Sequence, residues 1–405
     1  MMKKRLFKDK VLNGLTFFTS GISVLVLFAI FFFIFQKGYS TLSLDMLSNN
    51  YWSVNYNLAI PESSQSVYTY PSIESGESFS SKYGIAFKDD FSPDKKALIV
   101  VSYVDPASPF KLLTDLSAGP NQGQVIPIQL GMNIEKIVYT NTLGVDRSAG
   151  VIFKQNASEL VNILDTQATK LLSTYTQTEG GGIKGSLIAT LYLILISLAI
   201  AMPLGIFSAI YLTEYAAKNK TSAFIRSSIE LLTGVPSIIY GLMGMVVLYP
   251  ITTLFKVSGP SVLLGGLTLS IILLPTIIRT TEEALKVVPE HFRSASLSLG
   301  ANYSQTIFKV VLPSAVPGIL TGILLSVGRV IGESAALIYT MGTFVNDSPS
   351  VTRGGTSLAV QIWSIMSGEQ PNFALASAIS IIILGIVLFI NISIKLLAHR
   401  FAKTW

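Results

Sequence analysis

Six long stretches of the chain carry apolar side chains with few or no charged residues among them. They cover residues 11–35, 185–213, 231–255, 257–278, 310–344 and 370–394. Each is long enough to supply the roughly 20 apolar residues that cross a bilayer as an α-helix. Backbone N–H and C=O groups in lipid must pair within the protein, so helices are the default for such runs. The pattern therefore predicts an all-α polytopic membrane protein with six transmembrane helices.

The basic residues outside these stretches fall on one side of the membrane if all six cross it. Lys and Arg gather before the first stretch, between the second and third, between the fourth and fifth, and after the sixth. Cytoplasmic loops are enriched in Lys and Arg, so both termini are expected in the cytoplasm. The first stretch, within 1–35, is too long for a typical signal-peptide h-region and predicts an uncleaved signal-anchor.

A polar segment of different composition, residues 36–182, lies between the first two spans. It carries ten Lys and Arg against fourteen Asp and Glu, a net charge of −4, whereas the rest of the chain carries +10. Residues 95–104 and 125–130 predict strands, and the apolar spacing of 158–174 predicts a helix. We expect a small soluble α+β domain outside the cytoplasm, with no catalytic constellation. The triple glycine at 180–182 predicts a flexible joint to the second span.

Composition excludes several classes of protein. Of the 405 residues 50% are hydrophobic and only 13% are charged, against about a quarter charged in soluble domains. With no cysteine and two histidines, neither disulfides, thiol catalysis nor a metal site is expected. No G-x-x-x-x-G-K-[ST] motif occurs, so ATP binding in a P-loop is not expected. The net charge of +6 is attributed to membrane topology rather than to nucleic-acid binding.

The loop between the fourth and fifth spans, residues 282–313, has an amphipathic pattern. Apolar side chains recur at helical spacing on both sides of Gly300, and Asn302 or Ser304 could cap a second helix. We predict two short amphipathic helices joined by a turn at residues 300–302. Two alternatives stay open for their apolar side, which could lie on lipid or dock into a groove of a partner protein.

Two runs in this loop, SAS at 294–296 and VVLP at 310–313, with a glycine between them, resemble the EAA loop of ABC-transporter permeases. That motif is Glu-Ala-Ala, three residues, Gly, nine residues and then Ile-x-Leu-Pro, and here a serine stands in place of its Glu. The resemblance implies a coupling helix that inserts into a cleft of a separate ATP-binding subunit. The residues it assigns to this coupling are Ser294, Ala295, Leu299, Gly300 and Ala301.

Three further runs extend the resemblance over about residues 185–395. They are TGVPS at 233–237, RTTEEAL at 279–285 and GRVIGES at 328–334. Together with the EAA loop they are similar to PstA-type permeases of phosphate ABC importers, within the type I ABC importer permease family. The resemblance implies that family's transmembrane domain over residues 183–398, and it does not cover the 36–182 insert.

Two charged residues, Arg329 and Glu333, lie inside the fifth predicted span. On insertion scales each costs about 2.5–3.5 kcal/mol or more near a bilayer centre, so both are expected to face protein or water. Their i,i+4 spacing predicts that they share one helix face. One interpretation is an anion passage, with Ser334 beside it, in which the guanidinium binds phosphate oxygens. Glu333 would neutralise Arg329 in the empty passage or accept a hydrogen bond from a protonated phosphate oxygen. The other interpretation is a structural ion pair with a neighbouring helix.

Further charged residues lie at the ends of the third and fourth spans. Arg279, Glu282 and Glu283 are predicted to gate the cytoplasmic mouth or to form salt bridges with the ATPase, and a solvated helix end is the alternative. Arg226 and Glu230 predict an i,i+4 pair at the start of the third span. Two prolines inside spans, Pro236 and Pro275, predict kinks in their helices.

The resemblance thus implies the membrane permease subunit of an ATP-driven importer of inorganic phosphate, in a bacterial cytoplasmic membrane. It would form half of the translocation pathway and catalyse no reaction itself. Its expected partners are a second permease of the PstC type, a dimer of ATP-binding subunits that hold ATP and Mg²⁺, an extracytoplasmic phosphate-binding protein and membrane lipid. No cofactor, metal or nucleic acid is expected on this chain. The alternatives are a permease of the same architecture for molybdate or sulfate, and a membrane sensor with an outer ligand-binding domain.

Overall fold

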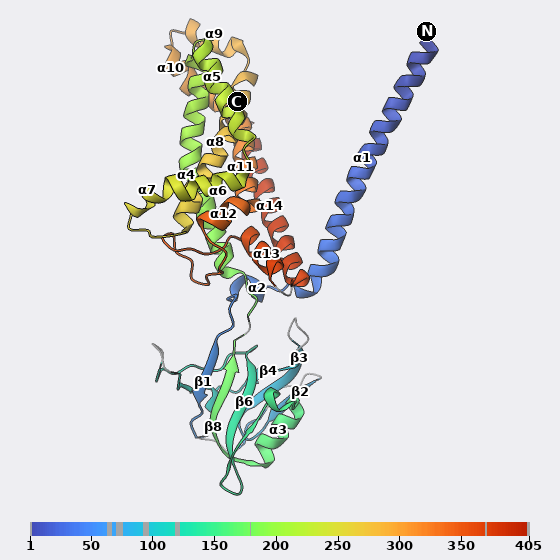
Figure 1. Cartoon of the computed structure of the whole chain (residues 1–405), viewed down its shortest axis with the longest axis vertical. Coiled ribbons are helices and arrows are strands. Elements are labelled where there is room, and N and C mark those ends of the chain that lie inside the picture. Colours follow the sequence, from blue (N-terminus) through green and yellow to red (C-terminus); the bar gives the residue numbers. More distant parts are fainter. Residues whose placement is uncertain are drawn as a thin grey trace. The chain divides into compact units, whose positions relative to one another are not determined.

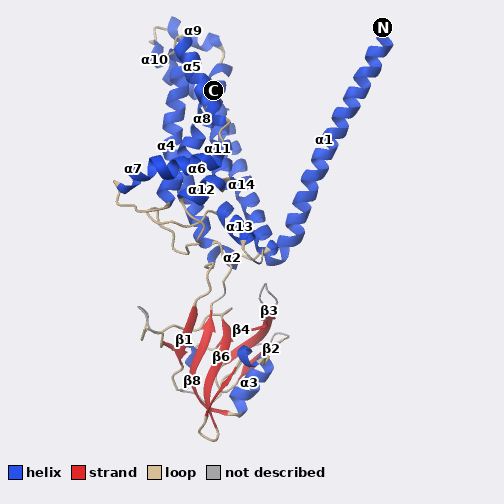
Figure 2. Cartoon of the chain, in the orientation of Figure 1, coloured by secondary structure: helices blue, strands red, loops and turns tan. Residues whose placement is uncertain are grey.

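The chain folds into two compact units. The computed structural model describes residues 2–62, 67–69, 76–91, 97–117, 122–178, 180–368 and 371–402. One unit combines Met1–Ser48 with Ile183–Trp405, and the other is Asn49–Gly182. The first unit is helical and the second is built around a sheet (Figure 1, Figure 2). The sheet unit is therefore an insertion in the sequence of the helical unit.

Among the described residues of the helical unit, five helices are long and apolar enough to cross a membrane. They are α1 (Met2–Gly38), α4 (Lys184–Ile210) with the π-turn η4 (Tyr211–Tyr215), α8 (Val262–Val287), α11 (Leu312–Gly332) preceded by α10 (Tyr303–Thr306) and the π-turn η6 (Ile307–Val311), and α14 (Phe373–Ala402). The shorter elements are η1 (Tyr39–Thr41), α2 (Asp45–Ser48), α5 (Lys220–Thr233), α6 (Ser237–Met243), the π-turn η5 (Gly244–Leu248), α7 (Tyr249–Thr253), α9 (Glu290–Ser298), α12 (Ala335–Thr340) and α13 (Leu358–Ser367).

The predicted third span, 231–255, is interrupted by a sharp bend. α5 ends at Thr233, α6 begins at Ser237, and the two pieces are bent by 102°. Pro236 stands at the break, where it lacks the N–H that a continuing helix would need. The kink predicted at this proline is confirmed, whereas Pro275 lies inside the unbroken helix α8. The bent pair makes a sixth crossing only if its two pieces form one span.

The predicted fifth span, 310–344, is also broken. α11 ends at Gly332 and α12 begins at Ala335, and Glu333 in the break has an extended backbone with φ −76° and ψ 124°. The prediction that Arg329 and Glu333 share one helix face is therefore wrong. Apolar composition alone does not reveal such a break, because the residues on both sides are equally apolar.

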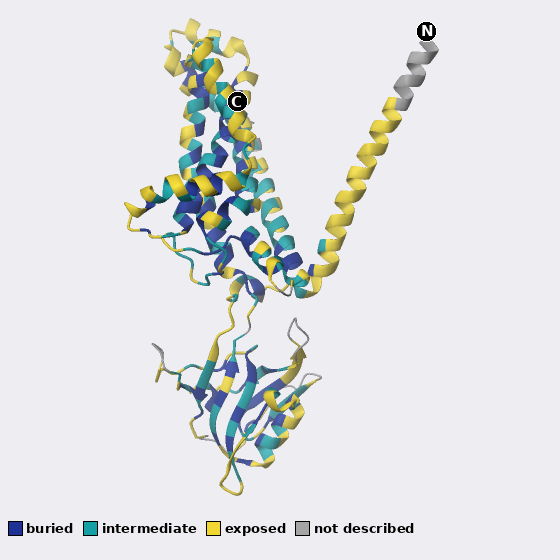
Figure 3. Ribbon diagram, viewed as in Figure 1, coloured by how far each residue is buried: buried dark blue, intermediate teal, exposed yellow. Residues whose placement is uncertain are grey.

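The core of the helical unit lies largely between α4 and α8. A Cβ added to Gly205 would come within 2.6 Å of the Ile277 side chain, and one added to Gly266 within 2.6 Å of Ile196. Small residues at such contacts let two helices approach closely. The outer surfaces of the unit stay apolar and exposed, most of all along α1 from residue 12 onward (Figure 3). An exposed apolar helix of this length is what a lipid environment covers.

The sheet unit contains an eight-stranded antiparallel sheet in the order β2-β3-β4-β6-β8-β1-β5, with β7 paired to β6. Its elements are β1 (Asn55–Ala59), β2 (Glu77–Ser80), β3 (Ile85–Phe91), β4 (Ala97–Val104), η2 (Pro109–Lys111), β5 (Thr114–Asp115), β6 (Asn133–Asn141), β7 (Asp146–Ala149), η3 (Val151–Phe153), α3 (Ala157–Thr166) and β8 (Ala168–Gln177). α3 packs against the sheet, and Leu160 and Leu164 on the helix are fully buried with Phe87 and Ile137 on the strands.

The strand predicted at 95–104 agrees with β4, which begins at the first residue described there. Residues 125–130 do not form a strand, since only an isolated bridge joins Val125 to Thr114. The helix predicted over 158–174 is right as far as Thr166 and wrong beyond it, where β8 begins. β8 pairs with β6 on one side and, over Ser173–Gln177, with β1 on the other, so ladder hydrogen bonds override the local helical spacing.

Residues 180–182, predicted as a flexible joint, run beside the first residues of the sheet unit. The Gly181 N–H donates to the Tyr51 carbonyl at 2.9 Å, and the Gly182 N–H to the Asn50 carbonyl at 3.0 Å. A Cβ on Gly182 would collide with the backbone of Asn49. Glycine is needed here because the returning chain runs directly against the outgoing one.

Candidate functional site

Arg329 is a half-buried cation within an apolar span, close to the end of α11. Among the residues that the structure describes, its guanidinium forms no hydrogen bond and no ion pair. It lies near enough to the Tyr240 side chain of α6 for an electrostatic interaction. A guanidinium carries five N–H donors, and a charge at membrane depth must face protein, water or ligand. The donors of Arg329 are therefore free to bind an anion.

Glu333 does not neutralise Arg329. Its Oε1 accepts a hydrogen bond from the Ala336 N–H at 3.3 Å, so the carboxylate caps the first turn of α12. Ser334 is the N-cap residue of α12, yet its side chain makes no capping hydrogen bond. The three residues predicted to line the substrate pathway, Arg329, Glu333 and Ser334, thus lie at or next to one helix break, without the ion pair proposed between two of them.

Tyr240 was missed by sequence reasoning and connects the two helix breaks. Its hydroxyl donates to the Leu232 carbonyl at 2.7 Å, across the bend between α5 and α6. Its ring belongs to the core cluster that includes Ala336 of α12. The helices themselves touch, since a Cβ on Gly241 would lie 2.7 Å from the Ala336 carbonyl oxygen. Broken helices at membrane depth are tolerated where they line a protein cavity, and transporters use them for binding.

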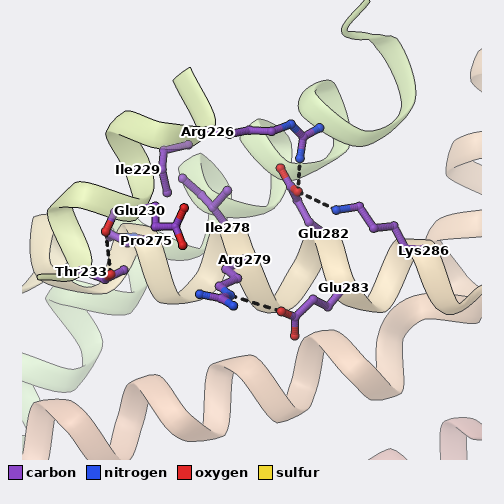
Figure 4. Close-up of a pocket in the computed structure, with 10 residues that line it drawn as sticks. All are labelled: Arg226, Ile229, Glu230, Thr233, Pro275, Ile278, Arg279, Glu282, Glu283 and Lys286. Carbon is purple, nitrogen blue, oxygen red and sulfur yellow. Dashed lines mark hydrogen bonds and ion pairs between the residues drawn. The ribbon is translucent and has the colours of Figure 1, made fainter. Parts of the chain in front are cut away.

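A charged pocket of about 280 Å³ lies between α5 and α8 (Figure 4). Glu282 is 10% exposed and accepts from Arg226 of α5 and, at 3.0 Å, from Lys286. Arg279 and Glu283 form a separate i,i+4 pair at 3.2 Å, with both side chains more than 60% exposed. The three residues predicted at the mouth therefore line one pocket but belong to two pairs.

The predicted pair between Arg226 and Glu230 is wrong. The Arg226 side chain turns toward α8 instead, where it pairs with Glu282, and it also donates to the Leu212 carbonyl of η4. Glu282 and the carbonyl offer a half-buried guanidinium two acceptors at once, which the exposed Glu230 does not.

The short helix and the turn predicted in the loop at 282–313 are confirmed, but the second helix is not short, since α10 continues through η6 into α11. α9 ends at Ser298, Gly300 has a φ of +86°, and α10 begins at Tyr303. Asn302 accepts from the Gln305 N–H at 2.8 Å, and the Gln305 side chain accepts from the Asn302 N–H at 3.0 Å. Of the residues predicted to couple to the ATPase, Ser294, Ala295, Leu299 and Gly300 are exposed and Ala301 is half-buried. Leu299 is 89% exposed, which leaves its apolar side chain available to a partner.

A buried ion pair that sequence reasoning missed holds this loop in place. Arg293 of α9 donates to Glu214 of η4, with Nη2 2.7 Å from Oε1 and Nε 3.4 Å from Oε2. The two side chains are only 11% and 5% exposed. The hydrogen bond to Glu214 raises the pKa of Arg293 above its ordinary value, so the guanidinium stays charged. The partners are 79 positions apart, and a charge at the end of the second apolar span was the only signal.

Residues 201–403 match the family described as the binding-protein-dependent transport system inner membrane component. The chain belongs to this family. The probable ABC transporter permease protein YqgI of Bacillus subtilis (strain 168) is 36% identical over 239 residues, which cover 55% of this chain and 80% of that protein. The permease is also similar to two proteins named phosphate transport system permease protein. PstA 2 of Mycobacterium bovis is 32% identical, covering 56% of this chain and 75% of its own. PstA of Yersinia pestis is 35% identical, and the match covers 56% of this chain and 74% of that protein.

The resemblance to PstA-type permeases is thereby confirmed. Family members are components of inner-membrane transport systems, and permease subunits are not themselves enzymes, so the chain is a transporter component. The matched residues begin within α4 and exclude the sheet unit, Asn49–Gly182. The family therefore accounts for the helical unit from there onward.

Proposed function

We propose that this permease forms half of the translocation pathway of an ATP-driven importer of inorganic phosphate. The similar proteins and the structure both support this proposal. The relatives named above include permeases of phosphate transport systems, with 32% and 35% identity. The structure supplies a guanidinium in a span that has no protein partner among the described residues.

The free guanidinium of Arg329 is the observation that carries the proposal. Its planar fork of N–H donors matches the oxygens of a tetrahedral oxyanion in a bidentate arrangement. A passing anion would satisfy donors that the chain leaves unsatisfied, and the Ser334 hydroxyl stands at the same break. Because Glu333 is engaged by the Ala336 N–H, its proposed contact with a protonated phosphate oxygen would use its second oxygen.

The proposed assembly has four kinds of partner. The bent pair of α5 with α6 and α7 would serve as one span, so that six spans place both termini in the cytoplasm and the sheet unit outside. A second permease of the PstC type would complete the pathway. Two ATP-binding subunits, which hold ATP and Mg²⁺, would dock on the loop at α9 through Ser294, Ala295, Leu299, Gly300 and Ala301. A phosphate-binding protein would deliver the substrate outside.

The proposed mechanism is alternating access. ATP binding closes the ATPase dimer, and α9 passes that movement to the spans. The two half-pathways then rock between inward-open and outward-open arrangements as largely rigid bodies. Arg279, Glu282 and Glu283 line the pocket at the cytoplasmic end and would meet the anion as it leaves.

The rival functions make different demands on the same residues. A permease for molybdate or sulfate would keep the architecture and the free guanidinium. A sensor with an outer ligand-binding domain would not need an unpaired charge within a span, so Arg329 argues against it.

ATP-dependent uptake by the reconstituted complex tests the proposal. Proteoliposomes that contain both permeases, the ATPase and the binding protein are supplied with labelled phosphate, sulfate or molybdate. We expect uptake of phosphate that requires ATP, with little uptake of the other two anions. Uptake of sulfate or molybdate in preference to phosphate would show that the substrate is another oxyanion, while the chain remains an importer permease. Absence of any ATP-driven uptake would refute the function.

A further inference from the structure

The π-turn η4 at the end of α4 is the meeting point of the cytoplasmic elements. The Leu212 carbonyl accepts from Arg226 of α5. The Glu214 side chain accepts from Arg293 of α9, and the Glu214 carbonyl accepts from the Tyr303 hydroxyl of α10 at 2.8 Å. One turn of backbone thus receives polar contacts from the coupling loop on one side and from the bent helix α5 on the other.

Arg293 uses its guanidinium to join three elements. It donates to Glu214 of η4 and, at the end of α8, to the carbonyls of Leu285 at 3.0 Å and Val288 at 2.9 Å. A cation also interacts favourably with the negative end of the α8 dipole. A forked, charge-assisted set of hydrogen bonds fixes both distance and orientation, whereas apolar contacts permit sliding.

Arg226 makes the described side-chain hydrogen bonds from α5 to α8 and η4, while the Leu232 carbonyl near the end of α5 accepts from Tyr240 of α6. The described residues of α5 include none that is buried, and the helix is followed by the 102° break. Arg226 joins α5 to Glu282 of α8 and to Leu212 of η4, while Ile229 adds a partial apolar contact. A displacement of η4 would therefore be passed to α5 through Arg226.

We propose that Glu214 and Arg293 are positioning residues that transmit movement of α9 to α4 and, through Arg226, to α5. This rests on the proposed function, because it assigns the route by which the ATPase moves the pathway. Loss of the pair leaves α9 able to dock but no longer able to move α5 with it. Hydrolysis of ATP then continues while transport per ATP falls.

The test uses the complete reconstituted complex and four variants of this chain. Glu214→Gln and Arg293→Met each break the pair, and the double variant Glu214→Leu/Arg293→Met replaces it with apolar side chains. Such replacement of a buried pair often preserves or improves stability, so the double variant keeps the test valid if a single variant misfolds. Glu62→Gln is the matched control, because it removes an exposed ion pair with Lys170 in the sheet unit.

We expect phosphate transported per ATP hydrolysed to fall at least tenfold in the double variant and in each single variant that assembles, with the ATPase still co-purifying. The control should keep the wild-type ratio. A purely stabilising pair predicts instead that the thermally stable double variant transports at the wild-type ratio, and that result would overturn the proposal.

A second readout does not depend on the substrate. This chain has no native cysteine, so spin labels at His291→Cys on α9 and Phe224→Cys on α5, in a complex whose partner subunits are cysteine-free variants, report one distance. Coupled movement predicts that this distance stays constant when ATP binds to the wild-type complex and changes in the double variant. A change in the wild type, or none in the double variant, would overturn the proposal. Failure of the proposed function appears separately, as a wild-type complex that takes up no phosphate.

Discussion

Arg293 and Arg329 are two arginines in opposite situations. Arg293 makes five side-chain hydrogen bonds, to two carboxylates and two helix-terminal carbonyls. Arg329 makes none among the described residues, although it lies in a span. A guanidinium that is fully satisfied by its own chain fixes geometry, whereas one left unsatisfied is available to a ligand. The number of partners, rather than burial, separates the two roles.

The strongest expected effect concerns the unsatisfied arginine. Arg329→Ala should lower ATP-driven phosphate uptake at least about 100-fold, because a charged bidentate contact within a low-dielectric passage is lost. The complex should still assemble, since no described side chain forms a hydrogen bond or an ion pair with Arg329. Uptake of labelled phosphate and co-purification of the partners measure both outcomes.

Two companion variants sharpen this result. Arg329→Lys keeps the charge without the planar fork and should give intermediate uptake. Arg353→Ala removes an exposed arginine after α12 and should leave uptake unchanged. Normal uptake by Arg329→Ala would show that Arg329 does not bind the transported anion, and the proposed difference in role from Arg293 would be wrong.

The satisfied arginine should show its effect in stability. Arg293→Met leaves the Glu214 carboxylate buried at 5% exposure without its cation. Removing one partner of a buried ion pair costs about 3–5 kcal/mol. We expect a clearly lower melting temperature of the purified complex, with most of the loss recovered by adding Glu214→Leu. A single variant as stable as the wild type would show that the carboxylate finds another partner.

A smaller effect is expected at the surface of the coupling loop. Leu299 is 89% exposed, so Leu299→Asp should not change the stability of the permease itself. It should weaken docking of the ATPase by about tenfold or more, as for a central apolar interface residue. Titration of the ATPase against permease in nanodiscs measures the affinity. Unchanged affinity would place the docking surface elsewhere.

The smallest effect is expected for the exposed pair at the mouth. Arg279 and Glu283 are 65% and 63% exposed, so Glu283→Gln should change stability by less than about 1 kcal/mol. Glu282→Gln in the same pocket should cost more, because Glu282 is 10% exposed and serves two cations. Thermal melting of both variants side by side gives the comparison, and equal losses would contradict it.

The spans and the turn in the loop at 282–313 can be predicted from the sequence because both depend on local signals. Apolar runs reveal membrane helices, and Gly300 and Asn302 supply a left-handed turn and a helix cap within a few residues of each other. The breaks after Thr233 and Gly332 escape hydropathy because apolar residues flank them on both sides. Pro236 alone gave warning of the first break.

The residues of the candidate site also differ in how far the sequence predicts them. Arg329 stands out from sequence alone, because a charge in an apolar run has few neighbours of its kind. The prediction that Glu333 neutralises Arg329 is wrong, because the i,i+4 rule assumes a continuous helix and α11 ends between the two residues. The ion pair between Glu214 and Arg293 could not be predicted from the sequence, because it depends on how η4, at the end of α4, packs against α9. A contact between residues far apart in the sequence is not marked by any regular sequence spacing.

The tight glycine contacts at the end of the sheet unit have a consequence for how this chain is assembled. Because Gly182 lies against Asn49, the insertion begins and ends at nearly the same point. A module with adjacent ends can be added to a loop or removed from it without stretching the host. The permease body could thus acquire such a domain in a single insertion event, and a short Gly-Ser bridge in its place should leave the fold of the helical unit intact.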